Sequence, residues 1–205
     1  MVQEQLIPGG ITHPAVLYAM NTVPRHLFVE EGLWPQAYGD FPLPIGEGQT
    51  ISQPYIVALM TQLLQLKGHE KVLEIGTGCG YQSAVLASLC KELYMVERLK
   101  PLLARARKNF DMLRLYNIFS RADDGTQGWP EHAPFDAIIV TASGPQIPQP
   151  LIDQLADPGV LVIPVGDRDS QVLTVVRKEK GRVASQAVES VRFVKLVGSH
   201  GWTPR

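Results

Sequence analysis

A short apolar segment that ends in an acid and runs directly into three glycines constrains this chain more than any other feature. The segment spans Val72 to Tyr81 and reads VLEIGTGCGY. A glycine loop at the carboxyl end of a buried strand lets a ligand approach the backbone closely, and in open α/β sheets such strand ends are where ligands bind. We therefore expect a ligand-binding α/β fold. The alternative is a tight strand-to-helix turn that binds nothing.

The spacing of the glycines and the acid before them indicate the kind of ligand. A dinucleotide fingerprint has the spacing G-x-G-x-x-G, whose third glycine packs the helix on the strand. Here Gly76, Gly78 and Gly80 follow each other at every second position, and the bulky Tyr81 comes next. The carboxylate of Glu74 would repel a pyrophosphate but would suit a ligand with an ammonium or sulfonium charge. S-adenosylmethionine carries both charges.

Length and composition favour one globular domain. Of the 205 residues, 45% are apolar and 19% are charged, and the net charge is -1. Without a basic excess, nucleic acid is not expected as a partner. No apolar run is long enough to span a membrane, and the first residues lack the basic and apolar regions of a secretion signal. We therefore expect a cytoplasmic protein that does not bind membranes.

The cysteines and histidines suggest neither a disulfide framework nor a metal site. Cys79 and Cys90 are eleven positions apart and do not belong to a C-x-x-C pair. The five histidines are scattered without the spacing of metal ligands. We expect each of them to be an ordinary surface or loop residue.

Strand-like and helix-like segments alternate along most of the chain. Parallel strands are expected at residues 72–75, 92–97, 117–121, 135–142 and 160–165. Helices are expected at residues 12–20 with Thr12 as N-cap, 25–31, 54–66, 81–89, 99–113 and 147–155, the last stopped by Asp157-Pro158-Gly159. Residues 171–177 and 188–197 are rich in β-branched side chains, and their connection has no room for a crossover helix. They should pair antiparallel at one edge of the sheet.

A polar loop with two glycines, residues 46–53, precedes the helix that Pro54 opens. The start of a helix offers free backbone N–H groups and the positive end of its dipole, which suit a carboxylate ligand. The alternative is that Thr50 and Ser52 only cap this helix.

Acidic residues follow two further strands. Glu97 lies seventeen positions after Gly80, near the offset of about 20 residues at which a ribose-binding carboxylate follows a nucleotide loop. The alternative for Glu97 is an ordinary surface acid at a strand end. Asp123, Asp124 and Gly125 follow the next strand, where an acid can accept a hydrogen bond from the exocyclic amino group of an adenine. Together with Glu74, these acids could line one nucleoside pocket.

Several motifs carry a resemblance to a known family. They are PIGEGQTISQP at 44–54, VLEIGTGCGYQ at 72–82, Glu97-Arg98, Asp124-Gly125, PFDAIIVTA at 134–142 followed by Pro148, PGVLVIPVG at 158–166 and VRFVKLVG at 191–198. With the alternating strands and helices, they resemble the class I S-adenosylmethionine-dependent methyltransferases, and within that class the protein-L-isoaspartate O-methyltransferases. The specific element is PIGEGQTISQP, because unrelated methyltransferases share the glycine motif.

The resemblance implies a Rossmann-like, doubly wound α/β fold whose mostly parallel seven-stranded sheet has an antiparallel edge. It implies one domain over residues 1–205, in which residues 1–54 form a helical cap with a substrate and cofactor loop and residues 55–205 form the core. Ser52 matches the active-site serine. The cofactor contacts map to Ile45, Gly46, Glu47, Gly48, Glu74, Gly76, Thr77, Gly78, Gly80, Tyr81, Glu97, Arg98, Asp124 and Gly125. The substrate contacts map to Thr50, Ile51, Ser52, Thr141 and Ala142.

The resemblance also implies the ligands and partners. The cofactor is S-adenosylmethionine, which leaves as S-adenosylhomocysteine, and no metal takes part. The partners are isoaspartyl-containing proteins and peptides, and we expect a monomer. The chain departs from the family pattern at Asp123, which often is a glycine, at Ser143-Gly144, which replaces a more apolar pair, and at Lys195, which replaces a proline. Its amino-terminal region is also shorter than in the bacterial members.

The residues permit a carboxylate as methyl acceptor. Methyl transfer from a sulfonium is an in-line displacement, in which the positioning of the nucleophile dominates. Amine methyltransferases of the N-P-P-Y type hold the amino group after the fourth strand, where this chain has residues 141–144 and no base. A carboxylic acid with a pKa near ~4 is already an anion at neutral pH and needs only donors such as the Ser52 hydroxyl.

The family resemblance names this acceptor as the α-carboxyl of an L-isoaspartyl residue. The methyl ester would close to a succinimide and thereby begin the repair of a damaged protein. Two alternatives remain: a methyltransferase for a small molecule or nucleic acid on the same scaffold, and a nucleotide-binding module without catalysis.

Overall fold

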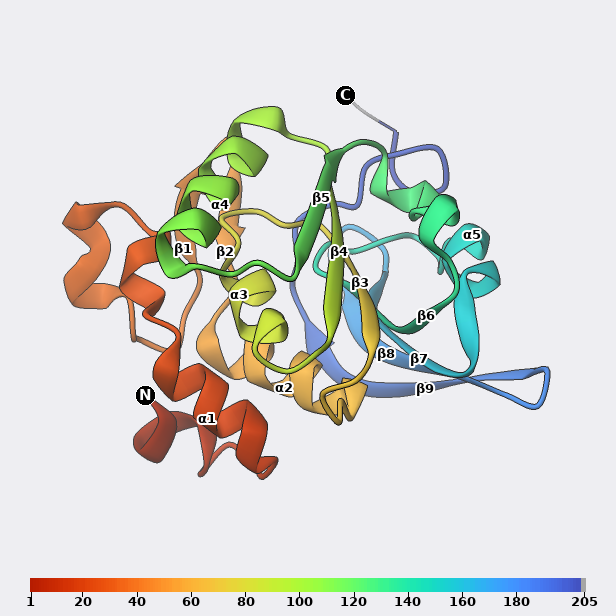
Figure 1. Ribbon diagram of the computed structural model, residues 1–205, viewed down its shortest axis with the longest axis horizontal. Helices are drawn as coiled ribbons and strands as arrows, with labels where there is room; N and C mark the ends of the chain where they lie inside the picture. The colour runs from red at the N-terminus through yellow and green to blue at the C-terminus, as the bar shows by residue number, and fades with distance from the viewer. Residues whose placement is uncertain (204–205) are drawn as a thin grey trace.

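A seven-stranded sheet runs through the computed structural model, which describes residues 1–203 (Figure 1). Its strands are β3 (Lys71–Ile75), β4 (Glu92–Glu97), β5 (Ile118–Ala122), β6 (Phe135–Val140), β7 (Leu155–Gly166), β8 (Gln171–Glu179) and β9 (Arg182–Val191). They lie in the order β5-β4-β3-β6-β7-β8-β9. β3 to β7 pair in parallel, whereas β8 pairs antiparallel with both β7 and β9. The expected Rossmann-like sheet with an antiparallel edge is thus confirmed.

The central strands are mostly apolar because both faces of the sheet are covered. On β3, Val72 belongs to the cluster of buried side chains on one face, and its neighbour Leu73 belongs to the cluster on the other. Ile139 and Ile138 on β6 divide in the same way. Successive side chains of a strand point to opposite faces. A strand covered on both sides therefore needs a nearly continuous apolar run, and FDAIIV is such a run except for the exposed Asp136 near its start.

Helices form the two covering layers. Helices α1 (Pro14–Thr22), α2 (Pro54–Leu64), α3 (Tyr81–Ala87) and α4 (Lys100–Leu113) pack on one face, and α5 (Gln149–Asp153) packs on the other. Short 3-10 turns at Arg25–Phe28, Glu31–Gln36, Gly125–Gln127 and Pro130–His132 and a π-helical turn at Val2–Leu6 complete the described chain. None of the helices within residues 1–203 is both long and apolar enough to cross a bilayer.

A small hairpin replaces the loop that the sequence predicted before α2. Strands β1 (Leu43–Gly46) and β2 (Gln49–Ile51) pair antiparallel (Figure 1). The chain reverses through Gly46, Glu47 and Gly48, whose φ angles of 88°, 53° and 66° are all positive. Glycine reaches this region without steric cost, so the G-E-G sequence favours a tight reversal. The expectation of a loop over residues 46–53 is therefore corrected for Gly46, which ends β1, and for Gln49–Ile51, which form β2.

The first helix does not begin as expected. α1 starts at Pro14, its N-cap is His13, and Thr12 does not cap it. The N–H groups of Thr12 and His13 instead donate to Oε1 of Gln62 on α2, at 2.8 and 2.9 Å. A side chain from a distant part of the sequence thus accepts hydrogen bonds from the backbone N–H groups that come just before the helix.

The antiparallel edge also differs from the predicted boundaries. The Asp157-Pro158-Gly159 turn lies within β7, and α5 ends earlier, at Asp153. The carboxylate of Asp157 accepts hydrogen bonds from the N–H groups of Lys180 and Gly181, at 2.7 and 2.6 Å, and so ties the turn to the tip of the β8–β9 hairpin. This hairpin extends beyond the body of the sheet, at the lower right of Figure 1. It includes residues 182–187, which the sequence had placed in a connection.

Candidate active site

A cavity of about 390 Å³ opens where the strand order reverses, between the carboxyl ends of β3 and β6. In open α/β sheets this reversal point is where a crevice for a ligand forms. Residues of the β1–β2 hairpin, α2, the glycine loop, the β4–α4 connection, the end of β6 and the C-terminal segment line the cavity. The cavity therefore draws on segments from most of the chain.

Thr141 joins the ends of the two central strands. Its N–H donates to the carbonyl oxygen of Ile75 at 2.9 Å, and its hydroxyl donates to the carbonyl of Gly76. Gly76 has a φ of +91°, and a Cβ on it would lie 2.6 Å from the Thr141 hydroxyl oxygen. Only glycine therefore allows this close contact between the loop and β6. The result is a rigid floor for the cavity, formed mainly by backbone.

Glu97 holds the glycine loop from the neighbouring strand. The residue is buried at the end of β4 and lines the cavity. Its Oε2 accepts a hydrogen bond from the N–H of Gly78 at 2.9 Å, and its Oε1 accepts one from the N–H of Leu99 at 2.8 Å. Each carboxylate oxygen can accept a second hydrogen bond. The carboxylate can therefore bind two hydroxyl groups of a ligand while it keeps the loop in place.

Gly80 serves packing between helices rather than the cavity. A Cβ on Gly80 would lie 2.7 Å from the ring of Phe110 on α4, and its φ is +90°. The start of α3 therefore packs directly against α4. The next residue, Tyr81, does line the cavity, and its ring contacts Phe28 edge to face.

Glu74 lies within β3 and is fully buried, outside the lining of the cavity. Neither carboxylate oxygen has a hydrogen-bond partner among residues 1–203. Burial raises the pKa of Glu74 to about 8. The nearby hydroxyl of Ser83 opposes this increase, and the negative charge of Glu97 adds to it. The carboxyl is thus mostly protonated at neutral pH and supplies little counter-charge. This geometry does not support the electrostatic argument for Glu74, and its contact with a cofactor stays a prediction.

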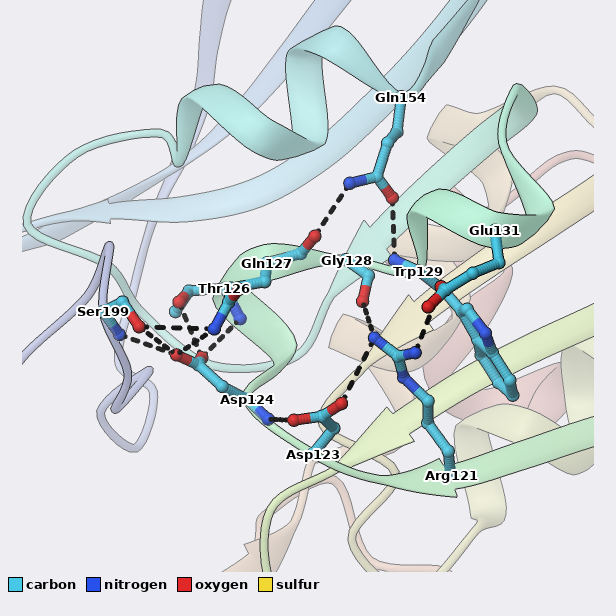
Figure 2. A network of polar contacts seen from close by, with 10 residues as sticks. All are labelled: Arg121, Asp123, Asp124, Thr126, Gln127, Gly128, Trp129, Glu131, Gln154 and Ser199. Carbon is cyan, nitrogen blue, oxygen red and sulfur yellow. Dashed lines mark hydrogen bonds and ion pairs between the residues drawn. The ribbon is translucent and has the colours of Figure 1, made fainter.

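Asp124 is bound within the protein, as Figure 2 shows. Its Oδ2 accepts hydrogen bonds from the N–H and the hydroxyl of Ser199 at 2.8 and 2.7 Å, and its Oδ1 accepts from the N–H and the hydroxyl of Thr126 at 2.9 and 2.6 Å. Burial alone would raise the pKa of Asp124, but these donors outweigh it and hold the pKa below its usual range. Asp124 therefore ties the C-terminal segment to the end of β5. Its contact with an adenine stays a prediction.

A second cavity, of about 660 Å³, lies beside the first on the side of β9. Four residues line both cavities: Thr50, Ser52, Thr141 and Val194. None of their side chains can act as a base at neutral pH. Ser52 follows β2 and precedes the N-cap of α2, which is Gln53, and no side chain caps this helix. The structure thus gives no support to the capping alternative for Thr50 and Ser52.

The ionisable side chains around the first cavity offer little acid–base chemistry. They are Cys79, Tyr81, Glu97, Arg98 and Lys195. Burial raises the pKa of the Cys79 thiol to about 11, so this thiol stays protonated. The cavity has no histidine in its lining, and residues 1–203 contain no cluster of side chains that could hold a metal ion. Binding and positioning are what this site can do best.

The structure brings together most of the residues that the sequence nominated. Those that line the first cavity are Gly48, Thr50, Ile51, Ser52, Gly76, Thr77, Gly78, Tyr81, Glu97, Arg98, Gly125, Thr141 and Ala142. Those that lie outside its lining are Ile45, Gly46, Glu47, Glu74, Gly80 and Asp124. Three residues of the second group belong to the hairpin that contributes to the lining. Gly46 and Glu47 form its turn, and Ile45 lies in β1.

The C-terminal segment contributes lining residues that sequence reasoning did not assign. Residues 194–197 line the first cavity after the chain has left β9. The N–H of Ser143 donates to the carbonyl of Val194 at 2.8 Å, and the N–H of Leu196 donates to the carbonyl of Ser143 at 2.9 Å. This ladder places the segment beside the end of β6. Its VRFVKLVG sequence is one of the motifs of the family resemblance, but its pattern indicated an edge strand and no role in a cavity.

Comparison with known proteins gives matches over nearly the whole chain. A family model described as Protein-L-isoaspartate(D-aspartate) O-methyltransferase (PCMT) matches residues 1–201. A protein named Protein-L-isoaspartate O-methyltransferase from Desulfotalea psychrophila is 58% identical over 202 residues, which cover 98% of this chain and 94% of that protein.

Solved structures give a similar result. A protein-L-isoaspartate O-methyltransferase superposes with a TM-score of 0.88 at 26% identity, covering 98% of this chain and 67% of that one. A Plasmodium falciparum structure, described as a beta-aspartate methyltransferase in complex with S-adenosyl-L-homocysteine, has a TM-score of 0.84 at 29% identity and covers 96% of both chains. The similarity therefore includes the hairpin and the C-terminal segment as well as the glycine loop.

Proposed function

Because this chain belongs to the protein-L-isoaspartate(D-aspartate) O-methyltransferase family, we propose that it transfers the methyl group of S-adenosylmethionine to the free α-carboxyl of L-isoaspartyl residues in proteins and peptides. One observation carries this proposal. Two cavities meet at Ser52 and Thr141, where the shared lining has no base. An acceptor that is already an anion at neutral pH fits such a junction.

The residues of the first cavity fit S-adenosylmethionine. The glycine loop presents backbone to the ligand, since a side chain on Gly76 would collide with Thr141. Glu97 keeps free lone pairs for the two ribose hydroxyls, and Gly125 lines the cavity at the end of β5. When bound, the cofactor supplies an electrophilic methyl group. The residues of the chain have to bind the cofactor, orient the acceptor and keep water away from the methyl group.

The second cavity suits the protein substrate. It lies between the start of α2 and residues 189–194, next to the β9 edge of the sheet. We propose that the isoaspartyl residue enters here and that its carboxylate reaches Ser52. The hydroxyl of Ser52 can donate one hydrogen bond to that carboxylate, which orients it without removing its charge. Positioning of this kind accounts for most of the catalysis that a methyl transfer needs.

The ester then leads to repair without further help from the enzyme. The backbone nitrogen of the following residue attacks the ester carbonyl, methanol leaves, and a succinimide forms. Water opens this ring at either carbonyl, so part of the product is normal aspartate. The isoaspartyl remainder can enter the cycle again.

Further properties belong to the same proposal. We propose a monomer as the active unit, and support comes from both cavities being lined by residues of one chain. We propose a cytoplasmic location, which agrees with the two free thiols of Cys79 and Cys90. With a net charge of -1, the protein has no general attraction for nucleic acid.

The chemistry of the product tests the proposed acceptor. We expect that incubation with methyl-labelled S-adenosylmethionine and an isoaspartyl peptide labels the peptide, and that mild alkali releases the label as methanol. A carboxyl methyl ester hydrolyses in this way, whereas a methylated amine does not. Label that survives alkali would exclude a carboxylate as the acceptor. The same peptide with its carboxyl converted to an amide should remain unlabelled.

Glu97→Ala should weaken binding of S-adenosylhomocysteine by about 1–3 kcal/mol, the range for hydrogen bonds to a charged group. The substitution removes both the ribose acceptor and the bond to Gly78 N–H. Isothermal calorimetry measures the change. Glu92→Ala, at the other end of β4, is the control and should bind normally. Equal affinity of the two variants would remove Glu97 from the cofactor site.

A further inference from the structure

Arg25 is a charged side chain that is buried without a carboxylate partner. Its exposed fraction is 0%, and it forms no ion pair with any residue between 1 and 203. Its Nε donates to the carbonyl of Ala37 and its Nη2 donates to the carbonyl of Ser52, both at 2.7 Å. Its Nη1 has no partner in the described chain. The guanidinium carbon lies 4.8 Å from the centre of the Tyr81 ring.

Stability alone does not account for this arrangement. Moving a charge out of water costs free energy unless a counter-charge and complete hydrogen bonding compensate for it. Burial lowers the pKa of Arg25, which is a sign of that cost. The group remains cationic, because arginine is not deprotonated in proteins. An apolar side chain would fill the space without this cost. The role of the arginine is therefore to be found in the groups that it contacts.

The carbonyl of Ser52 is the contact that links Arg25 to the active site. β2 ends at Ile51 and α2 begins at Pro54, so Ser52 lies between the hairpin and the helix. A hydrogen bond to its carbonyl fixes the orientation of the planar peptide group and therefore restricts the direction of the Ser52 side chain. The other contacts anchor the guanidinium: Ala37, which follows the 3-10 turn Glu31–Gln36, and Tyr81 at the start of α3.

We infer that Arg25 is a positioning residue for the methyl acceptor, because its planar guanidinium holds Ser52 in place through the main-chain carbonyl. This inference rests on the proposed function, in which Ser52 orients the isoaspartyl carboxylate. In the described chain, Arg25 lines neither cavity, so it acts through Ser52 and does not contact the substrate. Two charge-assisted hydrogen bonds from one rigid fork are what arginine offers and lysine does not.

A double-mutant cycle tests this route. Arg25→Met should lower kcat/KM for an isoaspartyl peptide by about 10-fold in the parent protein but by less than about 2-fold in the Ser52→Ala background. The dissociation constant of S-adenosylhomocysteine should change by less than about 2-fold in either background. Arg25→Lys keeps the charge but loses the fork, and it should recover little of the lost activity.

Arg121 provides a matched control, visible in Figure 2. Its guanidinium carbon also lies 4.8 Å from an aromatic ring, that of Trp129, and its Nη2 donates to the carbonyl of Gly128 at 3.0 Å. Arg121→Met should lower the melting temperature, as Arg25→Met does, because the contacts with Trp129 and Gly128 are lost together with the ion pairs to Asp123 and Glu131. The kcat/KM of the folded Arg121 variant should stay within about 2-fold of the parent value.

Several results would overturn the inference. One is an equal loss of kcat/KM from Arg25→Met in the parent protein and in the Ser52→Ala variant. The others are full activity of Arg25→Lys and a loss of affinity for S-adenosylhomocysteine that parallels the loss of activity. If Arg25→Met does not fold, Arg25→Lys in the two serine backgrounds provides the same comparison. If the parent protein methylates the isoaspartyl peptide and the losses from the Arg25 and Ser52 substitutions are additive, only the role of Arg25 is refuted. A parent protein that leaves the isoaspartyl peptide unmethylated refutes the proposed function itself.

Discussion

Ser52→Ala is expected to lower kcat/KM for an isoaspartyl peptide by about 10–100-fold, equivalent to about 1.4–2.7 kcal/mol of transition-state stabilisation. Ser52 lines both cavities at their junction. Its hydroxyl is one of the side-chain donors at this junction, and it is the donor that we expect to orient the acceptor carboxylate. The melting temperature should hardly change, because Gln53 is the N-cap of α2 and no side chain caps the helix. A helix cap would show the reverse pattern, a loss of stability of ~1 kcal/mol with near-normal turnover.

Ser143→Ala is the control for this measurement. The Ser143 hydroxyl is buried and has no hydrogen-bond partner in the described chain, and the residue lies outside the lining of both cavities. Steady-state kinetics and thermal melts on the two variants, side by side, distinguish a role in acceptor binding from a general effect of losing a serine hydroxyl. If both variants turn over like the parent protein, Ser52 does not take part in the reaction.

Glu74→Gln is expected to stabilise the protein at about pH 8 and to have little effect at about pH 4.5. The carboxyl of Glu74 is fully buried, and burial raises its pKa from 4.5 to about 8. Between these two values the unfolded chain releases the proton while the folded protein keeps it. The stability of the parent protein therefore falls as pH rises through this window. The full loss is on the order of 5 kcal/mol, and a neutral glutamine avoids it.

Urea unfolding at several pH values across this window measures the effect. The difference in free energy of unfolding between Glu74→Gln and the parent protein should grow steadily with pH and then level off. Glu92→Gln, on the neighbouring strand, is the control, because Glu92 is partly exposed and should not produce this trend. A difference that stays constant with pH would show that Glu74 is ionised in the folded protein. The pKa argument would then be wrong.

The sheet and the glycine loop could be predicted because their signals are local. The run from Phe135 to Val140 can be buried on both faces only as a central strand, and the sequence indicated this strand almost to its ends. The glycines of the loop mark a backbone that turns sharply, and the positive φ of Gly76 bears this out. Strand β4 was predicted at its observed bounds, Glu92–Glu97, for the same reason.

Features that depend on distant partners could not be predicted in this way. Asp124 accepts its hydrogen bonds from Ser199, which lies 75 positions further along the chain, and no local pattern indicates that pairing. The hairpin at residues 43–51 is short, and its glycines suggested a loop. Arg25 received no role because its partners are carbonyl groups, which have no sequence signature. The sequence thus indicated many of the residues that line the first cavity, and the tertiary contacts determine how these residues are held.

The most direct test of the account compares an isoaspartyl peptide with its aspartyl twin. The two peptides have the same composition and charge and differ only in which carboxyl of the aspartate forms the peptide bond. With saturating S-adenosylmethionine, the protein should form base-labile methyl esters on the isoaspartyl peptide and hardly any on the aspartyl twin. Equal labelling of both peptides, or labelling of neither, would contradict the central claim that this protein recognises and methylates isoaspartyl residues.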